Sequence, residues 1–233
     1  MKNRIIAIVP AAGLGKRFNA SIKKTFVNLK GVPLLIHTLK RLCEEKFITE
    51  VIPVLMEEDI DNGFQMVKKY NLKKIKRIAA GGKERQDSIY NALKLLEKNG
   101  TGTDSIVLIH DGVRPFIPKG LIENLIAELK NADGVIPGIP VKETLKEAAA
   151  DGIVINTVNR EKLWSVHTPQ AFFFNIIKKA YDTAYTEGFY ATDDASLIER
   201  IGGRVKIIPD SPYNIKVTMP EDMDMLEWIL GKN

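Results

Sequence analysis

The chain has 233 residues, of which 45% are hydrophobic and 27% are charged, which is the composition of a globular protein with room for one sizeable core. Its 34 lysines and arginines outnumber its 29 acidic residues, but the basic residues are scattered through predicted helices, so we expect solvated helix faces and no nucleic-acid partner. The single cysteine, Cys43, excludes an internal disulfide bond and a CxxC metal site.

The first predicted strand covers residues 5–9, an unbroken apolar run rich in β-branched residues that is typical of a strand buried on both faces of a parallel sheet. Pro10 has no N–H to donate to a neighbouring strand, so it marks the end of this strand. Because the strand begins almost at the amino terminus and no apolar run is long enough to span a membrane, we expect a cytoplasmic protein with no signal peptide and no membrane partner.

The next loop, AAGLGKR over residues 11–17, is small and basic. Glycines let a ligand approach the backbone and successive N–H groups attract oxyanions, so the loop predicts a phosphate-bearing ligand; the alternative is a plain strand-to-helix turn. It is not a Walker A loop, because Arg17 follows Lys16 where that motif requires Ser or Thr. It is not a dinucleotide fingerprint either, because Phe18 occupies the place of the third glycine.

Strands and helices alternate as far as residue 141. Pro53 inside the second strand indicates an edge strand or a bulge. The alternation favours right-handed βαβ units and a three-layer α/β/α fold with a mainly parallel sheet, in which ligands bind beyond the carboxyl ends of the strands. The predicted helices span residues 33–45, 59–70, 84–98 and 119–130, and the further strands span residues 50–56, 76–80, 105–110 and 134–141.

Between residues 140 and 169 the pattern changes to short extended pieces. Residues 144–150 and 153–158 flank Asp151-Gly152, a strong two-residue turn signal, and together predict a hairpin. A hairpin this short cannot bury its apolar side alone, so we expect it to lean on another surface, for which a second copy of the chain is a candidate. The remaining predicted elements are strands at 164–167 and 204–208 and helices at 175–187, 194–201 and 220–230.

Two further strand-to-helix loops carry polar residues. Asp111 ends a buried strand in HDGVRP, where a carboxylate could hold Mg²⁺; a turn aspartate that satisfies local N–H groups is the alternative. Gly81, Gly82 and Ser88 in GGKERQDS could lie against a base edge; a flexible turn before a solvated helix is the alternative. Because Pro10, Gly81 and Asp111 all follow strands, their loops could converge on one cleft.

Several cations are candidates for binding phosphate, and each of them could instead be an ordinary surface charge. Three widely separated histidines and one cysteine argue against a zinc site, and the absence of a GxSxG motif argues against covalent catalysis. The candidate cations are Lys24, Arg114, Arg160, Lys216 and the pair in the first loop.

Eight segments and one lysine, taken together and in this order, closely resemble the 2-C-methyl-D-erythritol 4-phosphate cytidylyltransferase family of the non-mevalonate isoprenoid pathway. They are PAAGLGKRF, Lys24, GGKERQDS, HDGVRP, PVKET, TVNR, TPQAF, TDDAS and NIKVTMPED. The resemblance spans nearly the whole chain and implies one Rossmann-like nucleotidyltransferase domain over residues 1–233. It also implies a homodimer formed through a projecting β-arm at about residues 139–159.

The resemblance implies transfer of CMP from CTP to 2-C-methyl-D-erythritol 4-phosphate, with release of pyrophosphate and with Mg²⁺ as cofactor. Arg17 and Lys24 match the residues that stabilise the transition state, and Asp111 would hold the metal. Thr144 and Arg160 would reach the neighbouring subunit's site. The residues that bind the nucleotide would be Pro10, Ala11, Ala12, Gly13, Gly15, Gly81, Gly82, Ser88 and Asp111. The residues that bind or orient the second substrate would be Arg114, Thr144, Arg160, Thr168, Thr192 and Lys216. Of these, Arg160 and Lys216 are also expected to be catalytic.

Two departures from the family pattern stand out. Lys23-Lys24-Thr25 replaces the usual Pro-Lys-Gln, so a second lysine lies beside the expected catalytic one, and HDGVRP replaces the commoner HDAARP. Two alternative functions share most of these motifs. One is a ribitol 5-phosphate cytidylyltransferase, and the other is a protein that binds CTP without turnover, against which the retention of Arg17, Lys24 and Asp111 argues.

Overall fold

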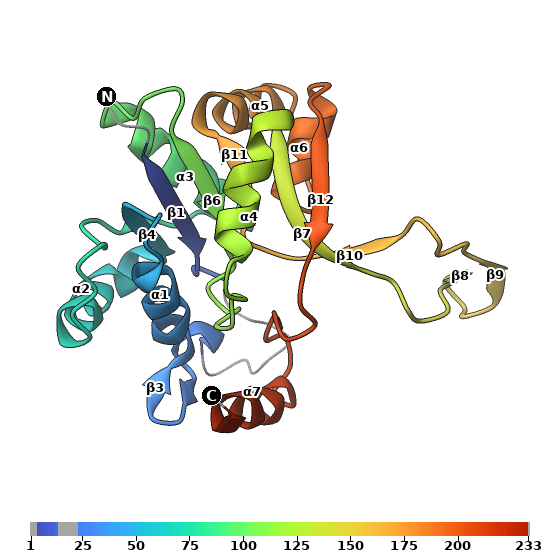
Figure 1. The fold of residues 1–233 in the computed structure, drawn as a ribbon, viewed down its shortest axis with the longest axis horizontal. Helices are drawn as coiled ribbons and strands as arrows, with labels where there is room; N and C mark the ends of the chain where they lie inside the picture. Colours follow the sequence, from blue (N-terminus) through green and yellow to red (C-terminus); the bar gives the residue numbers. More distant parts are fainter. Residues whose placement is uncertain (1–3, 14–22, 233) are drawn as a thin grey trace.

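A β-sheet forms the middle layer of the protein (Figure 1). Within residues 4–13 and 23–232, which this computed structural model describes, it has eight strands. They are β1 (Ile5–Pro10), β4 (Glu50–Leu55), β5 (Ala79–Ala80), β6 (Ile106–Ile109), β7 (Gly134–Pro140), β10 (Trp164–Val166), β11 (Gln170–Phe173) and β12 (Val205–Pro209). The order is β10-β7-β11-β6-β1-β4-β5, with β12 also paired to β7. As predicted, the sheet is mainly parallel, although β10 and β11 run antiparallel to their neighbours.

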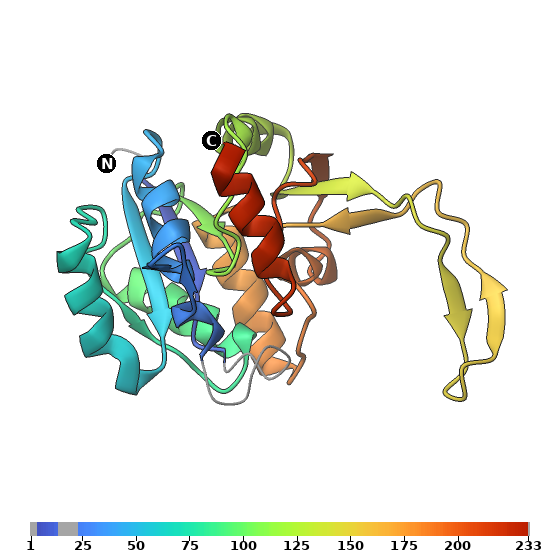
Figure 2. The ribbon, with the colours of Figure 1, turned by 90° about the horizontal axis from the view of Figure 1, so that it is seen from below.

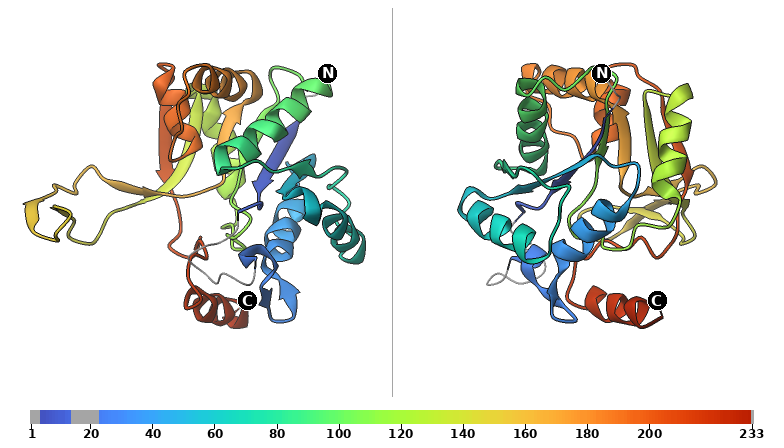
Figure 3. Two further views of the ribbon diagram at one scale, coloured as in Figure 1. Left: turned by 180° about the vertical axis from the view of Figure 1, so that it is seen from behind. Right: turned by 60° about the vertical axis from the view of Figure 1, so that its left-hand side comes forward.

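Helices cover both faces of the sheet (Figures 1 and 3). They are α1 (Leu34–Glu44), α2 (Ile60–Lys69), α3 (Arg85–Lys98), α4 (Leu121–Glu128), α5 (Phe174–Thr186), α6 (Asp194–Arg200) and α7 (Asp222–Lys232). Successive residues of a strand point to opposite faces, so Ala7 and Val9 of β1 pack with α1, α2 and α4, while Ile6 and Ile8 pack with α3, α5 and α6. The predicted three-layer α/β/α arrangement is therefore confirmed.

Most predicted elements are found close to their expected ends. The helix predicted over residues 84–98 is α3, which begins after Glu84 in a capping box with Asp87. The strand predicted at 76–80 is shorter, because only β5 pairs with the sheet. Pro53 is not in an edge strand, since β4 lies between β1 and β5. However, β5 pairs only with Val54 and Leu55, so the ladder to β5 does not require the N–H that Pro53 lacks.

The sequence analysis missed β11. This strand lies in the middle of the sheet, where Ala171 is paired with Leu108 of β6 and with Val135 of β7. Four residues directly before a helix give a weak local signal. Its position depends on two partners far away in the chain, which local periodicity does not reveal.

The last helix, α7, lies beyond the carboxyl ends of the parallel strands, as Figures 1 and 3 show. Leu226 of α7 packs on Leu29 of a small hairpin formed by β2 (Asn28–Leu29) and β3 (Val32–Pro33), and on Val113 in the loop after β6. Among the described helices, none combines the length and the apolar character needed to cross a membrane.

A β-arm projects from the body between β7 and β10, and Figure 2 shows it extending well away from the sheet. The arm, residues 141–163, ends in the predicted hairpin, formed by β8 (Lys146–Ala148) and the antiparallel β9 (Val154–Thr157). Gly152 in the turn has φ +85°, a left-handed conformation that glycine adopts without strain. Three apolar residues of the arm are more than half exposed: Ile153, Val154 and Ile155.

Candidate active site

A cavity of about 690 Å³ lies at the carboxyl ends of β1, β5 and β6. We call it the cleft. The loops after these three strands all contribute to its wall, as the sequence predicted. Nine of the predicted site residues line it: Pro10, Ala11, Ala12, Gly13, Lys24, Gly82, Ser88, Asp111 and Lys216. Gly15 and Arg17 lie outside the described residues, so their predicted roles stay predictions.

The loops after β1 and β5 are fastened to the end of β4. Ala11 donates its N–H to Val54 O at 2.9 Å, and Gly81 donates its N–H to Leu55 O at 2.6 Å. A Cβ on Gly81 would lie 2.4 Å from the Cβ of Ala12, which is closer than two carbon atoms can approach. A larger residue at position 81 would therefore clash, because the loops after β1 and β5 touch each other at this point.

Ser88 holds the Gly81-Gly82 turn in place. Its Oγ accepts a hydrogen bond from Gly82 N at 3.0 Å and donates one to Glu84 O at 3.1 Å. Its hydrogen is thus directed at Glu84, so the hydroxyl can offer a bound nucleotide an acceptor rather than a donor.

Asp111 is the centre of charge in the cleft. Among the described side chains, three cations lie around its carboxylate: Lys216 Nζ at 3.0 Å and Arg114 Nε at 3.3 Å from Oδ2, and Arg85 Nε at 3.4 Å from Oδ1. Burial alone would raise the pKa of the Asp111 carboxyl, but Arg85, Lys216 and Arg114 together hold this pKa well below its usual range. Asp111 is therefore ionised at neutral pH.

Sequence reasoning missed Arg85 and its partner Asp194. Arg85 donates from both terminal nitrogens to the two oxygens of Asp194, at 3.1 and 2.7 Å, and the Tyr181 hydroxyl donates to Asp194 at 2.6 Å. Both residues stand inside motifs that carried the resemblance, GGKERQDS and TDDAS. The charge of each residue could have marked it as a candidate, but neither motif contains a pattern that predicts which residue is its partner.

His110 and Thr168 form a buried hydrogen-bond network with the backbone of Asp111. His110 Nε2 donates to Arg114 O at 2.9 Å, because a carbonyl can only accept, and its Nδ1 lies 3.0 Å from Thr168 Oγ1. Burial lowers the pKa of His110 to about 4, which agrees with a neutral ring in this arrangement. Asp111 N donates to Thr168 Oγ1 at 3.1 Å, so the Thr168 hydroxyl fixes the backbone of Asp111. Its predicted contact with the second substrate stays a prediction.

Arg114 is buried beside Asp111 and is not part of the cleft wall. Its Nη1 donates to Asn214 O at 2.7 Å, and the Asn214 side chain donates to Thr168 O at 2.8 Å. This network joins the HDGVRP loop to the segment that carries Lys216. Arg114 therefore positions its neighbours in this structure, and its predicted substrate contact is untested.

Three predicted substrate-binding residues lie apart from the cleft within one chain. Thr144 and Arg160 are exposed on the β-arm, where Arg160 donates to Lys142 O, and Thr192 is exposed in the loop before α6. None of the three lines the cleft. A second subunit would be needed to bring Thr144 and Arg160 to a site of this kind.

Lys23 and Lys24 have different surroundings. Lys23 Nζ lies 2.5 Å from Asp59 and 2.9 Å from Glu58, at the start of the segment that leads into α2. Lys24 lines the cleft. Lys23, the added lysine in this departure from the family pattern, is thus bound by acidic residues of the segment before α2, whereas Lys24 is part of the cleft wall.

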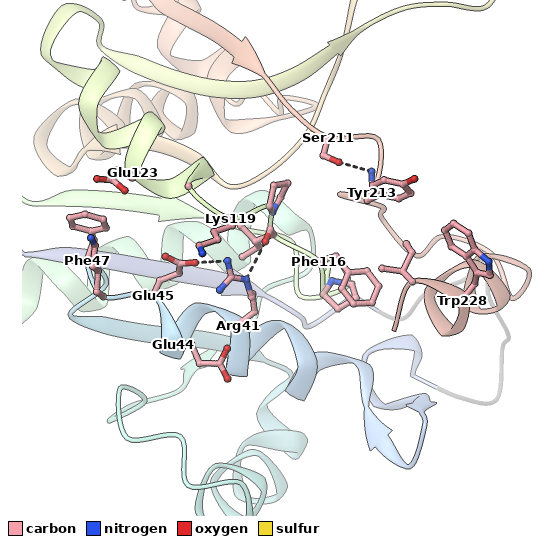
Figure 4. A pocket seen from close by; sticks show the side chains of 16 residues that line it. Arg41, Glu44, Glu45, Phe47, Phe116, Lys119, Glu123, Ser211, Tyr213 and Trp228 are labelled. Carbon is pink, nitrogen blue, oxygen red and sulfur yellow. Dashed lines mark hydrogen bonds and ion pairs between the residues drawn. The ribbon is translucent and has the colours of Figure 1, made fainter. Parts of the chain in front are cut away.

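Another cavity, of about 930 Å³, lies between the end of α1, the loop at residues 115–120 and α7 (Figure 4). Arg41 in its wall is paired with Glu45 at 2.6 Å and donates to Ile117 O at 3.1 Å. None of the predicted site residues lines it. Although it is the larger of the two, its described ion pair joins one cation to one carboxylate, whereas three cations surround Asp111 at the cleft.

The sequence of this chain is similar to those of known proteins. The sequence model of the family described as "IspD: 2-C-methyl-D-erythritol 4-phosphate cytidylyltransferase" matches residues 5–232. The enzyme of that name from Clostridioides difficile is 44% identical over 225 residues, covering 96% of this chain and 92% of the relative, and the one from Syntrophus aciditrophicus is 41% identical over 236 residues, covering 100% and 98%.

Solved structures are similar as well. The 4-diphosphocytidyl-2C-methyl-D-erythritol synthase from Anaerococcus prevotii has a TM-score of 0.83 and 31% identity, covering 98% of this chain and 96% of that one. The Francisella tularensis 2-C-methyl-D-erythritol 4-phosphate cytidylyltransferase has a TM-score of 0.82 and 27% identity, covering 97% and 99%. The chain therefore belongs to the 2-C-methyl-D-erythritol 4-phosphate cytidylyltransferase family.

Proposed function

We propose that this protein transfers CMP from CTP to 2-C-methyl-D-erythritol 4-phosphate, giving 4-diphosphocytidyl-2-C-methyl-D-erythritol and pyrophosphate for isoprenoid synthesis. Family membership supports this activity. The structural observation that carries it is the convergence of residues 10–13, Gly82, Asp111 and two lysines on one cleft.

The chemistry suits a site that is rich in cations and lacks an available histidine. A phosphate oxygen of the second substrate forms a bond to the α-phosphorus of CTP, and the bond from that phosphorus to the bridging oxygen breaks, so that pyrophosphate leaves with the electron pair. The attacking oxygen is already anionic, so no strong general base is needed. His110 agrees with this, because both ring nitrogens are engaged within the protein.

The main difficulty is to bring two anions together while charge grows on the departing pyrophosphate. Fixed cations address it by positioning both phosphates and by stabilising the transition state. Lys24 and Lys216 lie in the cleft wall for this role, and we expect Arg17 to join them.

We also propose that Mg²⁺ takes part, held by Asp111. Among the described residues, no group of three His, Cys, Asp or Glu side chains could bind a metal alone. Mg²⁺ at a nucleotide site commonly takes one or two carboxylates together with phosphate oxygens and water, so one ionised carboxylate in the cleft wall fits a metal that arrives with the triphosphate. The ion would neutralise phosphate charge there.

The arm supports a homodimer in this proposal. Thr144 and Arg160 lie on the arm, away from the cleft of their own chain, and the exposed apolar residues of β9 need a surface to cover them. We therefore propose that each arm completes the neighbouring site.

The direct test is to mix the purified protein with CTP, Mg²⁺ and 2-C-methyl-D-erythritol 4-phosphate and to measure pyrophosphate. We expect one pyrophosphate for each 4-diphosphocytidyl-2-C-methyl-D-erythritol formed, and little with ribitol 5-phosphate. Faster turnover of ribitol 5-phosphate would replace the proposed substrate, and CTP binding without pyrophosphate release would mean a non-catalytic protein.

A further inference from the structure

We propose that Arg85 is a positioning residue which, held by Asp194, orients the Asp111 carboxylate in the cleft without cancelling its charge. This inference rests on the proposed function of the cleft and assigns a role to an ion pair whose arginine is part of the cleft wall.

The geometry of Arg85 is unequal toward its two partners. Both terminal nitrogens bind Asp194, at 3.1 and 2.7 Å, whereas only Nε approaches Asp111, at 3.4 Å. An arginine fork that binds both oxygens of one carboxylate has a set direction. Asp194 therefore decides where the guanidinium lies, and the remaining N–H is left facing Asp111 Oδ1.

The anchor is rigid. The Asp194 side chain is 1% exposed, and its Oδ1 also accepts from the Tyr181 hydroxyl at 2.6 Å. Asp194 is the first residue of α6, whose N-terminus is capped by Asp193 through a 3.1 Å bond from Ser196 N. The bonds to Asp194 therefore hold the Arg85 guanidinium in place, so that its Nε–H favours one orientation of the Asp111 carboxylate.

Charge balance gives the pair its second effect. Arg85 is shared between two carboxylates: it makes two bonds to Asp194 and a single longer contact to Asp111 Oδ1, while Lys216 and Arg114 contact Oδ2. Without Asp194 the whole fork could turn to Asp111 and compete with Mg²⁺ for the same carboxylate. The Arg85–Asp194 pair thus keeps the Asp111 carboxylate oriented and prevents Arg85 from binding both of its oxygens.

A purely structural role is the competing explanation, because the same ion pair joins α3 to α6. Removing one member leaves an uncompensated buried charge and destabilises the fold, whereas removing both leaves none. The double variant Arg85→Gln/Asp194→Asn therefore separates the two roles. Arg85→Lys is a second separating variant, because it keeps the charge and loses the fork.

Arg77→Gln is the matched control. Arg77 also binds a carboxylate that is 2% exposed, Glu50, with Nε at 2.6 Å and Nη2 at 3.3 Å. Glu50 is the first residue of β4 and lies at the end of the sheet opposite to the cleft. This variant removes an arginine from a buried carboxylate without reaching Asp111, although Glu50 keeps a second cation, Arg4.

The experiment measures the melting temperature, kcat, and the CTP dissociation constant with Mg²⁺ and with EDTA. We expect the double variant to melt above either single variant, yet to keep a kcat lowered roughly tenfold to a hundredfold. We expect Mg²⁺ to strengthen its CTP binding less than in the wild type, by about fivefold or more. Arg85→Lys should show the same losses, and Arg77→Gln should only melt earlier.

A double variant or Arg85→Lys with wild-type kcat and a wild-type effect of Mg²⁺ on CTP binding would overturn the inference and leave a structural ion pair. Failure of the proposed function looks different, since the wild type itself would then release no pyrophosphate. In that case the effect of Mg²⁺ on CTP binding would still decide the role of Arg85.

Discussion

At the scale of single residues, Lys23 and Lys24 show how neighbouring lysines differ in chemistry. Hydrogen bonding to Asp59 is the main cause that raises the pKa of Lys23, which is bound at the surface, while Lys24 lines the cleft. We expect Lys24→Ala to lower kcat by about a hundredfold and to change CTP affinity much less, because its charge acts most strongly on the transition state.

Steady-state kinetics and calorimetric binding of CTP would check this prediction. Lys23→Ala is the matched control and should leave both quantities near the wild type. Equal losses of kcat and of CTP affinity in Lys24→Ala would contradict a role specific to the transition state.

Gly81 is a second residue whose identity follows from contact. Its absent Cβ would overlap Ala12 at 2.4 Å, and Leu55 O would lie at 3.2 Å. We expect Gly81→Ala to push the loops after β1 and β5 apart and to weaken CTP binding at the proposed site by roughly tenfold, since overpacking commonly costs about 1–3 kcal/mol. Gly102→Ala should be neutral, because its Cβ would meet only Ser105 Oγ at 3.8 Å. Unchanged CTP affinity in Gly81→Ala would show that the loops adapt.

At the scale of elements, the β-arm has apolar side chains that the described remainder of the same chain does not cover. Ile155 in β9 is 62% exposed although it belongs to an apolar run. We expect Ile155→Asp to raise the dimer dissociation constant by roughly tenfold or more, because a buried interface residue would become a desolvated charge. Analytical ultracentrifugation over a range of protein concentrations would measure it.

The control for the arm is Phe64→Asp, which adds the same charge at an exposed apolar residue of α2. It should leave the oligomeric state unchanged. A wild-type protein that stays monomeric at all concentrations would contradict the proposed dimer.

At the scale of the whole molecule, His110 links stability to pH. Burial lowers its pKa to about 4 in the folded state, from 6.5 in the unfolded chain. The unfolded state therefore binds more protons between these values, so the free energy of unfolding is highest above pH 6.5 and falls as the pH drops toward 4. The expected loss from this group is about 3 kcal/mol.

Denaturant unfolding of the wild type and of His110→Gln between pH 7 and pH 4 tests this link. The stability advantage of the wild type should shrink as the pH falls, since the variant has no imidazole to protonate. An advantage that stays constant over this range would mean that the His110 ring does not titrate in this way.

Part of the fold and of the candidate site follows from local sequence patterns, and part follows only from contacts in the folded chain. From the sequence we expect that the loops at Pro10, Gly81 and Asp111 could converge, because the carboxyl ends of parallel strands lie at one edge and each residue follows a strand. Pro10 and Asp111 line the cleft, and Gly81 lies against Ala12 in its wall. The sequence by itself also determined most helices and strands, through hydrophobic periodicity, and the arm hairpin, through its Asp-Gly turn.

Contacts between segments that are far apart in the chain could not be predicted and are seen only in the folded protein. Arg85 and Asp194 are 109 residues apart, and β11 is placed by β6 and β7 rather than by its own four residues. Likewise, Lys23 pairs with Asp59, which is 36 residues away, whereas its neighbour Lys24 lines the cleft. Periodicity is a local property of the chain, whereas the partner of a buried charge or of a short strand is set by packing across the whole fold.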